Sequence, residues 1–249
     1  MKGNETETGV AREDPARRAE APPAPLFTLD EVSLRTLFIC CVAAMAVAGA
    51  APAVEVPHLD EARTAMGVED WDAAVAAGEA AVKESPDAAA AHSWLGRAYG
   101  QKAIHASVFT QLSWAKKCKT EFDKAVTLDP KDTDARIDLI QYYANAPGIA
   151  GGGRDKAREQ LEPLAALDPG RAALMSGYIL EKEKKVPEAE AEYRRAVALS
   201  PDDATIRWRT GRFFERTGRT DEAKASYREA LRLDPALDGA KKDLARLGG

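Results

Sequence analysis

The chain has 249 residues, a formal net charge of −5 and a pI near 5.4. Nucleic-acid-binding proteins normally carry a basic face that releases counterions from phosphates, and this acidic balance argues against that class. The short basic runs at 116–119 and 182–185 have acidic and apolar neighbours, which is typical of solvated helix faces. Helix-forming residues dominate, and no alternating β-branched runs occur between turns, so we expect an all-helical protein.

The first segment of the chain has the pattern of an export signal. Residues 1–31 are polar and rich in proline, with no helical period, so they are not expected to fold alone. An apolar run follows from 37 to 51 and ends in small residues that offer two A-x-A exits. These parts predict a secretory signal peptide over 32–53, cleaved after Ala50 or Ala53. The 31 preceding residues are either a disordered extension or a mis-called start, and in the second case Val32 would be the true initiator.

An uncleaved membrane anchor is the alternative, although the apolar run is shorter than the roughly 20 residues that a spanning helix needs. Cys40 and Cys41 lie inside the run rather than at its exit, which disfavours a lipoprotein. Cleavage would leave Cys118 alone, without a partner for an intrachain disulfide. We therefore expect a periplasmic or secreted protein that meets a membrane only if this segment is retained.

A repeated motif organises the rest of the chain. Leu-Asp-Pro occurs at 128–130, 167–169 and 233–235, with variants at 84–86 and 199–201. The prolines are separated by 44, 39, 32 and 34 residues, and an apolar pattern of helical period precedes each of them. Proline lacks an N–H and restricts the residue before it, so each motif should follow the end of a helix. A period in this range is typical of a helical solenoid.

These residues resemble the tetratricopeptide-repeat (TPR) family, in the form found in exported bacterial proteins. The last unit matches best, through Gly211, Phe214, Gly218, Ala223, Tyr227, Ala230 and Pro235. The resemblance implies an all-α, right-handed α-solenoid of about five helix-turn-helix repeats with a C-terminal capping helix. In such a fold the small residues allow helix A to cross helix B closely, and the aromatic residues fill the remaining volume.

The expected solenoid covers residues 54–249, and two of its units are too long. The expected units are 54–87, 88–131, 132–170, 171–202 and 203–236, with a cap at 237–249. The second unit has about ten extra residues near 102–114, which we interpret as a lengthened hairpin protruding from one edge. The third has about five extra residues at 146–153. Insertions in solenoids tend to gather on one face, often the binding face.

The glycine-rich loop 148–153 is a candidate phosphate site. It is followed by Arg154 and Asp155, where a phosphate-binding P-loop has Lys and Ser or Thr, and it follows a helix instead of a strand. A flexible turn leading to an N-cap at Asp155 is the preferred interpretation. An accessory or enzymatic role for this loop remains as an alternative.

No other group in the sequence predicts catalysis, a cofactor or a metal ion. Cys118 could pair with His92 or His105 as a nucleophile, but it occupies the position where the TPR pattern places a small residue at the helix crossing. The three histidines lack the spacing of a helical zinc site. We therefore expect a protein without enzymatic activity, cofactor or metal.

The expected function is partner binding. By resemblance to the TPR family, helix A of each unit lines the concave groove and presents the residues that contact a peptide or protein partner: Arg97, Gln101, Gln141, Asn145, Tyr178, Lys182, Trp208, Arg212 and Arg216. Arg and Tyr are enriched among binding hot spots. The family's two-carboxylate clamp is not reproduced, because Ser93, Ile137, Leu174 and Trp208 replace its lysine. The expected role is a scaffold or adaptor outside the cytoplasm; the alternative is a structural homo-oligomer stacked through its repeats.

Overall fold

The computed structural model describes residues 56–248, and every regular element in that part of the chain is helical. The expected extension (1–31) and signal peptide (32–53) lie outside the described residues. The helices are α2 (Leu59–Gly67), α3 (Trp71–Glu84), α4 (Ala89–His105), α5 (Val108–Leu128), α6 (Thr133–Asn145), the 3-10 turn η1 (Gly148–Ala150), α7 (Arg154–Glu159), α8 (Leu161–Leu167), α9 (Pro169–Lys182), α10 (Val186–Leu199), α11 (Ala204–Arg216), α12 (Thr220–Leu233) and α13 (Asp238–Arg246). The expected all-α solenoid is confirmed.

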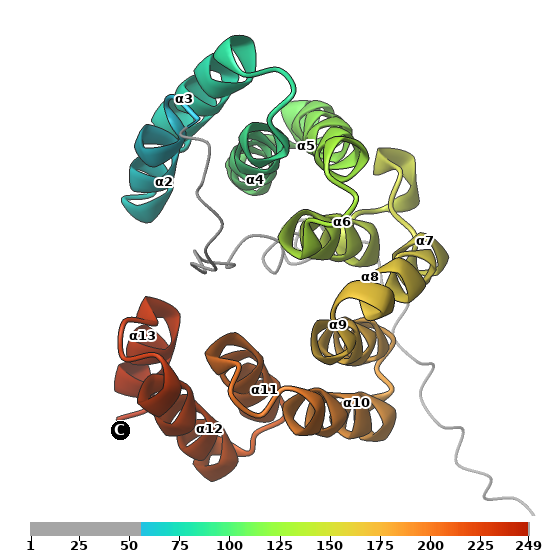
Figure 1. Ribbon diagram of the computed structural model, residues 1–249, viewed down its shortest axis with the longest axis vertical. Helices are drawn as coiled ribbons and strands as arrows, with labels where there is room; N and C mark the ends of the chain where they lie inside the picture. Colours follow the sequence, from blue (N-terminus) through green and yellow to red (C-terminus); the bar gives the residue numbers. More distant parts are fainter. Residues whose placement is uncertain (1–55, 249) are drawn as a thin grey trace, which may run out of the picture.

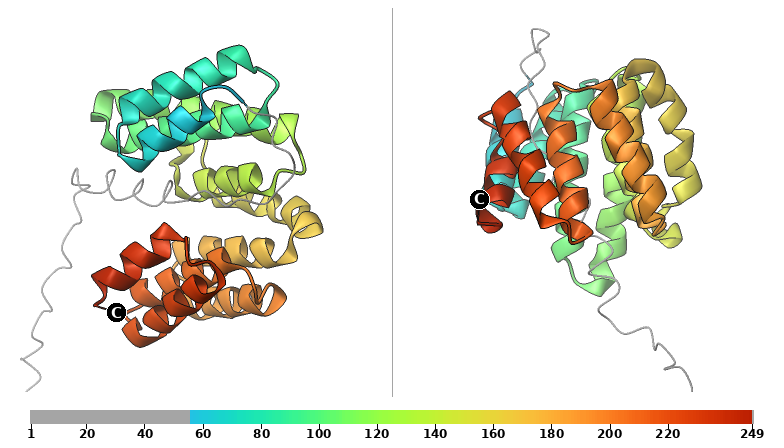
Figure 2. Two further views of the ribbon diagram at one scale, coloured as in Figure 1. Left: turned by 60° about the vertical axis from the view of Figure 1, so that its left-hand side comes forward. Right: turned by 90° about the horizontal axis from the view of Figure 1, so that it is seen from below.

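The helices form a C-shaped arc in which successive helix pairs stack side by side (Figure 1). The first helix of each pair from α4 onward, namely α4, α6, α9 and α11, lies toward the inside of the arc. The second helices, α5, α7 with α8, α10 and α12, form its outer layer (Figure 1). Figure 2 shows the same layering from two further directions. Helix α13 closes the series by packing against α12.

Aspartates begin several of these helices. The side chains of Asp70, Asp132, Asp168 and Asp203 each accept a hydrogen bond from a backbone N–H in the first turn of the following helix. Such N-caps satisfy donors that have no partner inside the helix. Asp168 belongs to a Leu-Asp-Pro motif, and Pro169 is the first residue of α9, where a missing N–H costs nothing. One motif therefore ends α8 and starts α9.

Glycines allow the two helices of a unit to cross closely. A Cβ atom on Gly96 of α4 would lie 2.6 Å from the ring of Phe122 on α5, and one on Gly211 of α11 would lie 2.6 Å from the ring of Tyr227 on α12. Both distances are shorter than real contacts allow. The packing therefore confirms the prediction that these small residues allow the two helices to cross closely.

Two clusters of buried side chains form the core. One extends from the first pairs to α6 and η1, and the other from α6 to α13. Tyr143 on α6 packs against both and joins them. Together the two clusters extend along the described part of the chain from Ala65 to Leu247.

The extra residues of the second unit lengthen both of its helices. Helix α4 has 17 residues and α5 has 21, whereas α9 to α12 have 13 or 14. The end of this hairpin extends past the ends of the neighbouring helices (Figure 2). The lengthened hairpin therefore has the form that the sequence analysis expects.

The extra residues of the third unit contain η1, and the helix that follows them is broken in two. Helix α7 ends at Glu159 and α8 begins at Leu161. Pro163 accounts for the break, because it removes a hydrogen bond to the carbonyl of Glu159 and its ring crowds that carbonyl. The expected N-cap at Asp155 is wrong: the N-cap is Gly153, and Asp155 lies in the first turn, where its charge favours the helix dipole.

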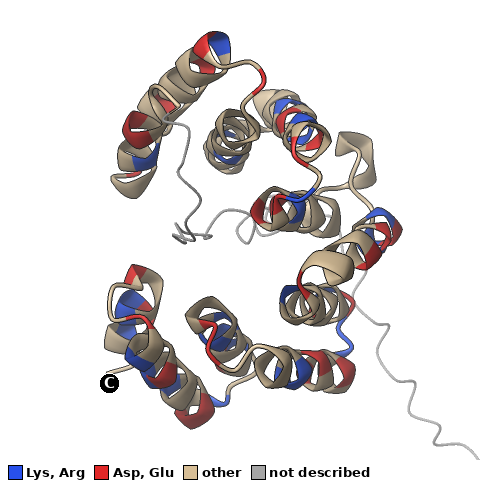
Figure 3. Ribbon diagram, viewed as in Figure 1, with Lys and Arg blue, Asp and Glu red and all other residues tan. Residues whose placement is uncertain are grey.

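Charges of both signs are spread over the helices rather than gathered into one patch (Figure 3). Most form surface ion pairs within a helix or between neighbouring helices, such as Arg194 with Glu190 at 2.7 Å. Pairs of this kind add little stability individually. Among residues 56–248, no helix is long and apolar enough to cross a membrane.

Candidate functional site

A pocket on the inner side of the arc brings together side chains from α6, α9, α10 and α11. It has a volume of about 470 Å³ including its open mouth. Its lining residues are Gln141, Leu174, Met175, Tyr178, Tyr193, Arg209, Arg212 and Arg216. This set, here called the arginine pocket, contains three arginines and two tyrosines and no carboxylate. It offers an apolar floor with several hydrogen-bond donors, as ligand pockets generally do.

The three arginines share one face of α11 because they are three and four residues apart. Arg216 forms a two-bond pair with Glu181 on α9, with distances of 2.5 and 2.8 Å. Arg212 lies over the ring of Trp208, 5.4 Å from its centroid, and its Nε is 3.7 Å from a carboxylate oxygen of Asp243. These two arginines are therefore partly compensated by neighbours.

Arg209 differs from them. Its Nε atom is buried and has no hydrogen-bond acceptor, and its guanidinium forms no ion pair with any described residue. Burial lowers the pKa of Arg209 from its ordinary value, and the nearby charge of Asp138 opposes that shift. A guanidinium remains protonated in proteins, so this charge persists in the pocket. Burying a charge without a partner is costly, and the cost would be relieved by an anion that entered the pocket.

A second hollow adjoins the arginine pocket, and Arg209 lines both. Here Arg97 on α4 donates a hydrogen bond to Asp138 on α6 over 2.7 Å. Only 9% of Arg97 and 3% of Asp138 is exposed. Burial raises the pKa of Asp138 to about 6, while Arg97 acts in the opposite direction. This buried ion pair links two successive units of the solenoid.

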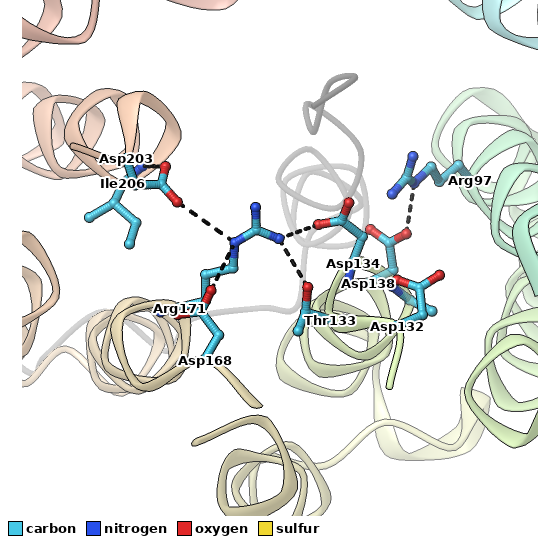
Figure 4. A network of polar contacts seen from close by, with 10 residues as sticks. Arg97, Asp132, Thr133, Asp134, Asp138, Asp168, Arg171, Asp203 and Ile206 are labelled. Carbon is cyan, nitrogen blue, oxygen red and sulfur yellow. Dashed lines mark hydrogen bonds and ion pairs between the residues drawn. The ribbon is translucent and has the colours of Figure 1, made fainter. Parts of the chain in front are cut away.

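Arg171 links three units at the same level. Its guanidinium donates to Asp134 and Thr133 of α6 at 2.6 and 3.1 Å, and it lies 3.7 Å from Asp203, the N-cap of α11. Figure 4 shows Arg171 between these groups, with the Arg97–Asp138 pair beside them. These contacts hold α6, α9 and α11 in register and so fix the wall on which the arginine pocket is built.

The structure divides the expected groove residues into two groups. Gln141, Tyr178, Arg212 and Arg216 line the arginine pocket. Asn145 and Lys182 both contact Tyr178: the amide of Asn145 donates to its hydroxyl at 2.6 Å, and Lys182 lies over its ring.

The other expected residues serve the framework or lie away from the pocket. Trp208 is only 2% exposed, and its indole N–H donates to Asp243 over 2.8 Å. Arg97 is held in the buried pair with Asp138. Gln101 is half-buried on α4, outside the residues that line the pocket. The sequence analysis missed Arg209, which lies between the positions at which the family contacts its ligands; only its helical spacing with Arg212 and Arg216 could have indicated it.

The amides of the glycine-rich loop are used inside the protein. The N–H groups of Ala150, Gly151, Gly152 and Gly153 donate to the carbonyls of Pro147, Gly148, Pro147 and Tyr143 at 2.8–3.2 Å. Gly151 has a φ of 88°, in the left-handed region that favours glycine. A phosphate loop needs free amides that point at the ligand. The geometry of this loop thus favours the turn over the phosphate site.

Gly152→Ala is therefore expected to destabilise the loop. A Cβ at this position would lie 1.8 Å from the carbonyl oxygen of Ala146, so the backbone of the turn must move. We expect a loss of about 2–3 kcal/mol in the free energy of unfolding, measured by urea denaturation. Gly148→Ala is the matched control, because nothing lies within 4 Å of its Cβ position. Equal stability of the two variants would contradict this description of the loop.

Cys118 and the histidines are engaged structurally. Cys118 is buried on α5 and belongs to the hydrophobic core. The ring of His92 contacts Glu121 at 2.5 Å and the carbonyl of Pro86 at 2.8 Å, while His105 stacks on Trp71. In the described residues no group of three or more His, Cys, Asp or Glu side chains could hold a metal ion.

Comparison with known proteins decides the family. The family model described as Tetratricopeptide repeat matches residues 59–102, 149–204 and 177–238, which together span more than half of the chain. The chain belongs to the tetratricopeptide-repeat family. No curated protein matches it by sequence.

One solved TPR structure shares the fold at low sequence identity, and two further solved structures show a weaker likeness. TTC0263, a thermophilic TPR protein of Thermus thermophilus, is 22% identical, with a TM-score of 0.55 over 76% of this chain and 96% of its own. YrrB, a TPR protein described as having an unusual peptide-binding site, is 18% identical, with a TM-score of 0.41 over 75% of this chain and 89% of its own. MamA is also 18% identical, with a TM-score of 0.41 over 72% and 90%. The TPR fold suggests a protein-interaction module, and TPR proteins are generally scaffolds without catalysis.

Proposed function

We propose that this TPR protein is a scaffold or adaptor that captures a peptide or protein partner on the inner side of its arc, and that the arginine pocket receives a carboxylate of that partner. The carboxylate would be an acidic side chain or the C-terminus of a peptide. Binding is an equilibrium between a preformed pocket and a flexible ligand, with no bond made or broken.

The observation that carries this proposal is the unpartnered Arg209. Its buried Nε has no acceptor among the described residues, and the pocket around it is lined by two further arginines and by no carboxylate. Arginine matches a carboxylate with two parallel hydrogen bonds, and such charge-assisted bonds are the strong ones. Tyr178 and Gln141 add polar groups that can orient the chain of the ligand. The apolar side chains of Leu174 and Met175 can contact its aliphatic parts.

The cellular location is a separate part of the proposal. The apolar run from 37 to 51 and its small-residue exits support export, with the periplasm of a bacterium as the place where the solenoid acts. N-terminal sequencing of the native protein is expected to begin after Ala50 or Ala53. A native N-terminus before residue 37 would mean that the apolar segment is retained, and it would favour the membrane-anchor alternative over export with cleavage.

Arg209→Met is expected to separate binding from stability. Methionine keeps the stem of the side chain and removes a half-buried guanidinium that forms no ion pair with the described residues, so the thermal midpoint should remain equal or rise by a few degrees. Capture of the partner should fall at least tenfold, because the loss of a charged hydrogen-bond donor costs about 1.5–3 kcal/mol. The measurement is cross-linked affinity capture from native cells, together with thermal denaturation of the same samples.

Arg228→Met is the matched control, since Arg228 is exposed on the outer helix α12. It should leave both capture and thermal midpoint unchanged. A variant at Arg209 that is stable and still captures the same partner would remove the arginine pocket from the proposed function. Loss of capture in both variants would place recognition elsewhere on the surface.

A further inference from the structure

The two insertions meet at one end of the molecule and expose apolar side chains there. Phe109 and Val108 open α5 at the end of the lengthened hairpin, and they are 95% and 61% exposed. Ile149 of η1 is 74% exposed. We call Val108, Phe109, Leu112 and Ile149 the apolar tip. Val108, Phe109 and Leu112 belong to the lengthened hairpin, whose end extends past the neighbouring helices (Figure 2), and Ile149 lines a hollow together with Val108 and Leu112.

The apolar tip is continuous with a hydrophobic hollow. Val108, Gln111, Leu112 and Ala115 of α5 form one wall, and Pro147, Ile149 and Ala150 form the other. The hollow has a volume of about 520 Å³ including its open side. Exposed apolar patches of this kind on a soluble domain mark contact with another protein or with a membrane.

The turn that carries Ile149 is held firmly, so its exposure is built into the fold. The hydroxyl of Tyr142 donates to the carbonyl of Ala150 over 2.7 Å, and both residues are buried. The amides of Gly151 to Gly153 close the turn, as described above. The neighbouring segment therefore presents Ile149 outward instead of burying it.

Cations outnumber anions in the chain around the apolar tip, although carboxylates neutralise two of them: Lys102 is paired with Asp72 and Lys119 with Asp123. Residues 102–120 and 146–154 contain Lys102, Lys116, Lys117, Lys119 and Arg154 and no aspartate or glutamate. Lys116 is exposed, forms no ion pair with any described residue, and follows Phe109 by seven residues on the same face of α5. The carboxylates that adjoin these two ranges along the chain are both engaged: Glu121 contacts His92, and Asp155 is paired with Arg158 at 2.8 Å. Exposed aromatic and aliphatic side chains flanked by free cations are the combination that enters the headgroup region of an anionic membrane.

We propose that the apolar tip docks the solenoid on a membrane surface that carries anionic headgroups. Phe109, Val108 and Ile149 enter the boundary between headgroups and acyl chains, while Lys116 and Arg154 contact the headgroups. This contact is additional to any made by the apolar segment at 37–51, and it leaves the arginine pocket free for its ligand. It is thus independent of the proposed peptide capture.

The test is co-sedimentation with vesicles of phosphatidylcholine alone or mixed with phosphatidylglycerol. Both the full chain and residues 56–249 are used, because the latter contain every helix that the structure describes and lack the apolar segment. Phe109→Ser with Ile149→Ser removes the apolar contact, and Lys116→Glu with Arg154→Glu reverses the charge. Val68→Ser with Leu199→Ser is the matched control, since these exposed apolar residues, 72% and 47% accessible, lie outside the apolar tip.

We expect residues 56–249 to bind the anionic vesicles and to bind neutral ones about tenfold more weakly. Each tip variant should lose binding about tenfold or more, and the control pair should keep it. Thermal denaturation verifies that the variants fold. Absence of binding to either kind of vesicle, or binding that the tip variants retain, would overturn the proposal. In the first case a protein partner covers the apolar tip instead.

Discussion

Asp138→Leu is expected to lower the free energy of unfolding by about 3–5 kcal/mol, because it leaves the buried guanidinium of Arg97 without its carboxylate. Arg97 cannot escape the cost by losing its proton. Arg209, which is also attracted by the charge of Asp138, adds to the loss. Urea denaturation at neutral pH measures the effect.

Arg97→Met is expected to cost less than Asp138→Leu, and its cost should depend on pH. Burial already raises the pKa of Asp138 to about 6, above its ordinary value of 3.8. The folded state therefore binds a proton between these pH values that the unfolded state has released, and stability falls as pH rises through this window. Without Arg97 the folded pKa rises further, so the variant should be closest to the parent in stability near pH 5.

Two outcomes would contradict this view of the pair. A loss below about 1 kcal/mol in Asp138→Leu would mean that the Arg97 side chain reaches solvent. An equal, pH-independent loss in both variants would mean that packing, not charge, dominates at this contact. Arg97 is held in a buried ion pair, so reversing its charge would lower stability whether or not it contacts a partner. Such a variant therefore cannot test partner binding.

Gly96→Ala is expected to destabilise the protein by about 2 kcal/mol, although alanine is the better helix former. The added Cβ would lie 2.6 Å from two atoms of the Phe122 ring, which is itself buried in the core between α4 and α5. The ring cannot swing into solvent, so the two helices must separate. Thermal or urea denaturation measures the loss.

Gly67→Ala is the matched control, because Gly67 is also helical and nothing lies within 4 Å of its Cβ position. It should leave stability unchanged or raise it by up to about 1 kcal/mol. The result that would contradict the crossing argument is the same small effect in both variants. A gain in Gly96→Ala would mean that propensity outweighs packing at the crossing.

The features that repeat along the chain were predictable from the sequence. The proline spacing locates the end of each unit, and the small residues such as Gly96 and Gly211 mark the crossings, because a repeated fold places the same physical demand at each copy. The lengthened hairpin follows from the same period, since the extra residues stand out against it.

Features that do not repeat along the chain were not predictable. Asp138 pairs with Arg97, which lies 41 residues earlier in another unit, and no local pattern indicates that both are buried. For the same reason the sequence did not indicate that Arg97 and Trp208 are held by Asp138 and Asp243. Arg209 was missed because family positions guided the choice, whereas its lack of a partner is visible only in three dimensions. Pro163 alone would predict the break at Gln160, but the repeat pattern predicts one continuous helix there.

The measurement that tests the central claim most directly is retention of the full chain on immobilised peptides that carry acidic residues and a free C-terminus. Each peptide is paired with a twin in which the carboxylates are replaced by amides. We expect the parent to bind a subset of the acidic peptides and to ignore their twins, and Arg209→Met to lose those same peptides while remaining folded. Equal binding to acidic peptides and twins, or undiminished binding by Arg209→Met, would contradict carboxylate recognition by the arginine pocket.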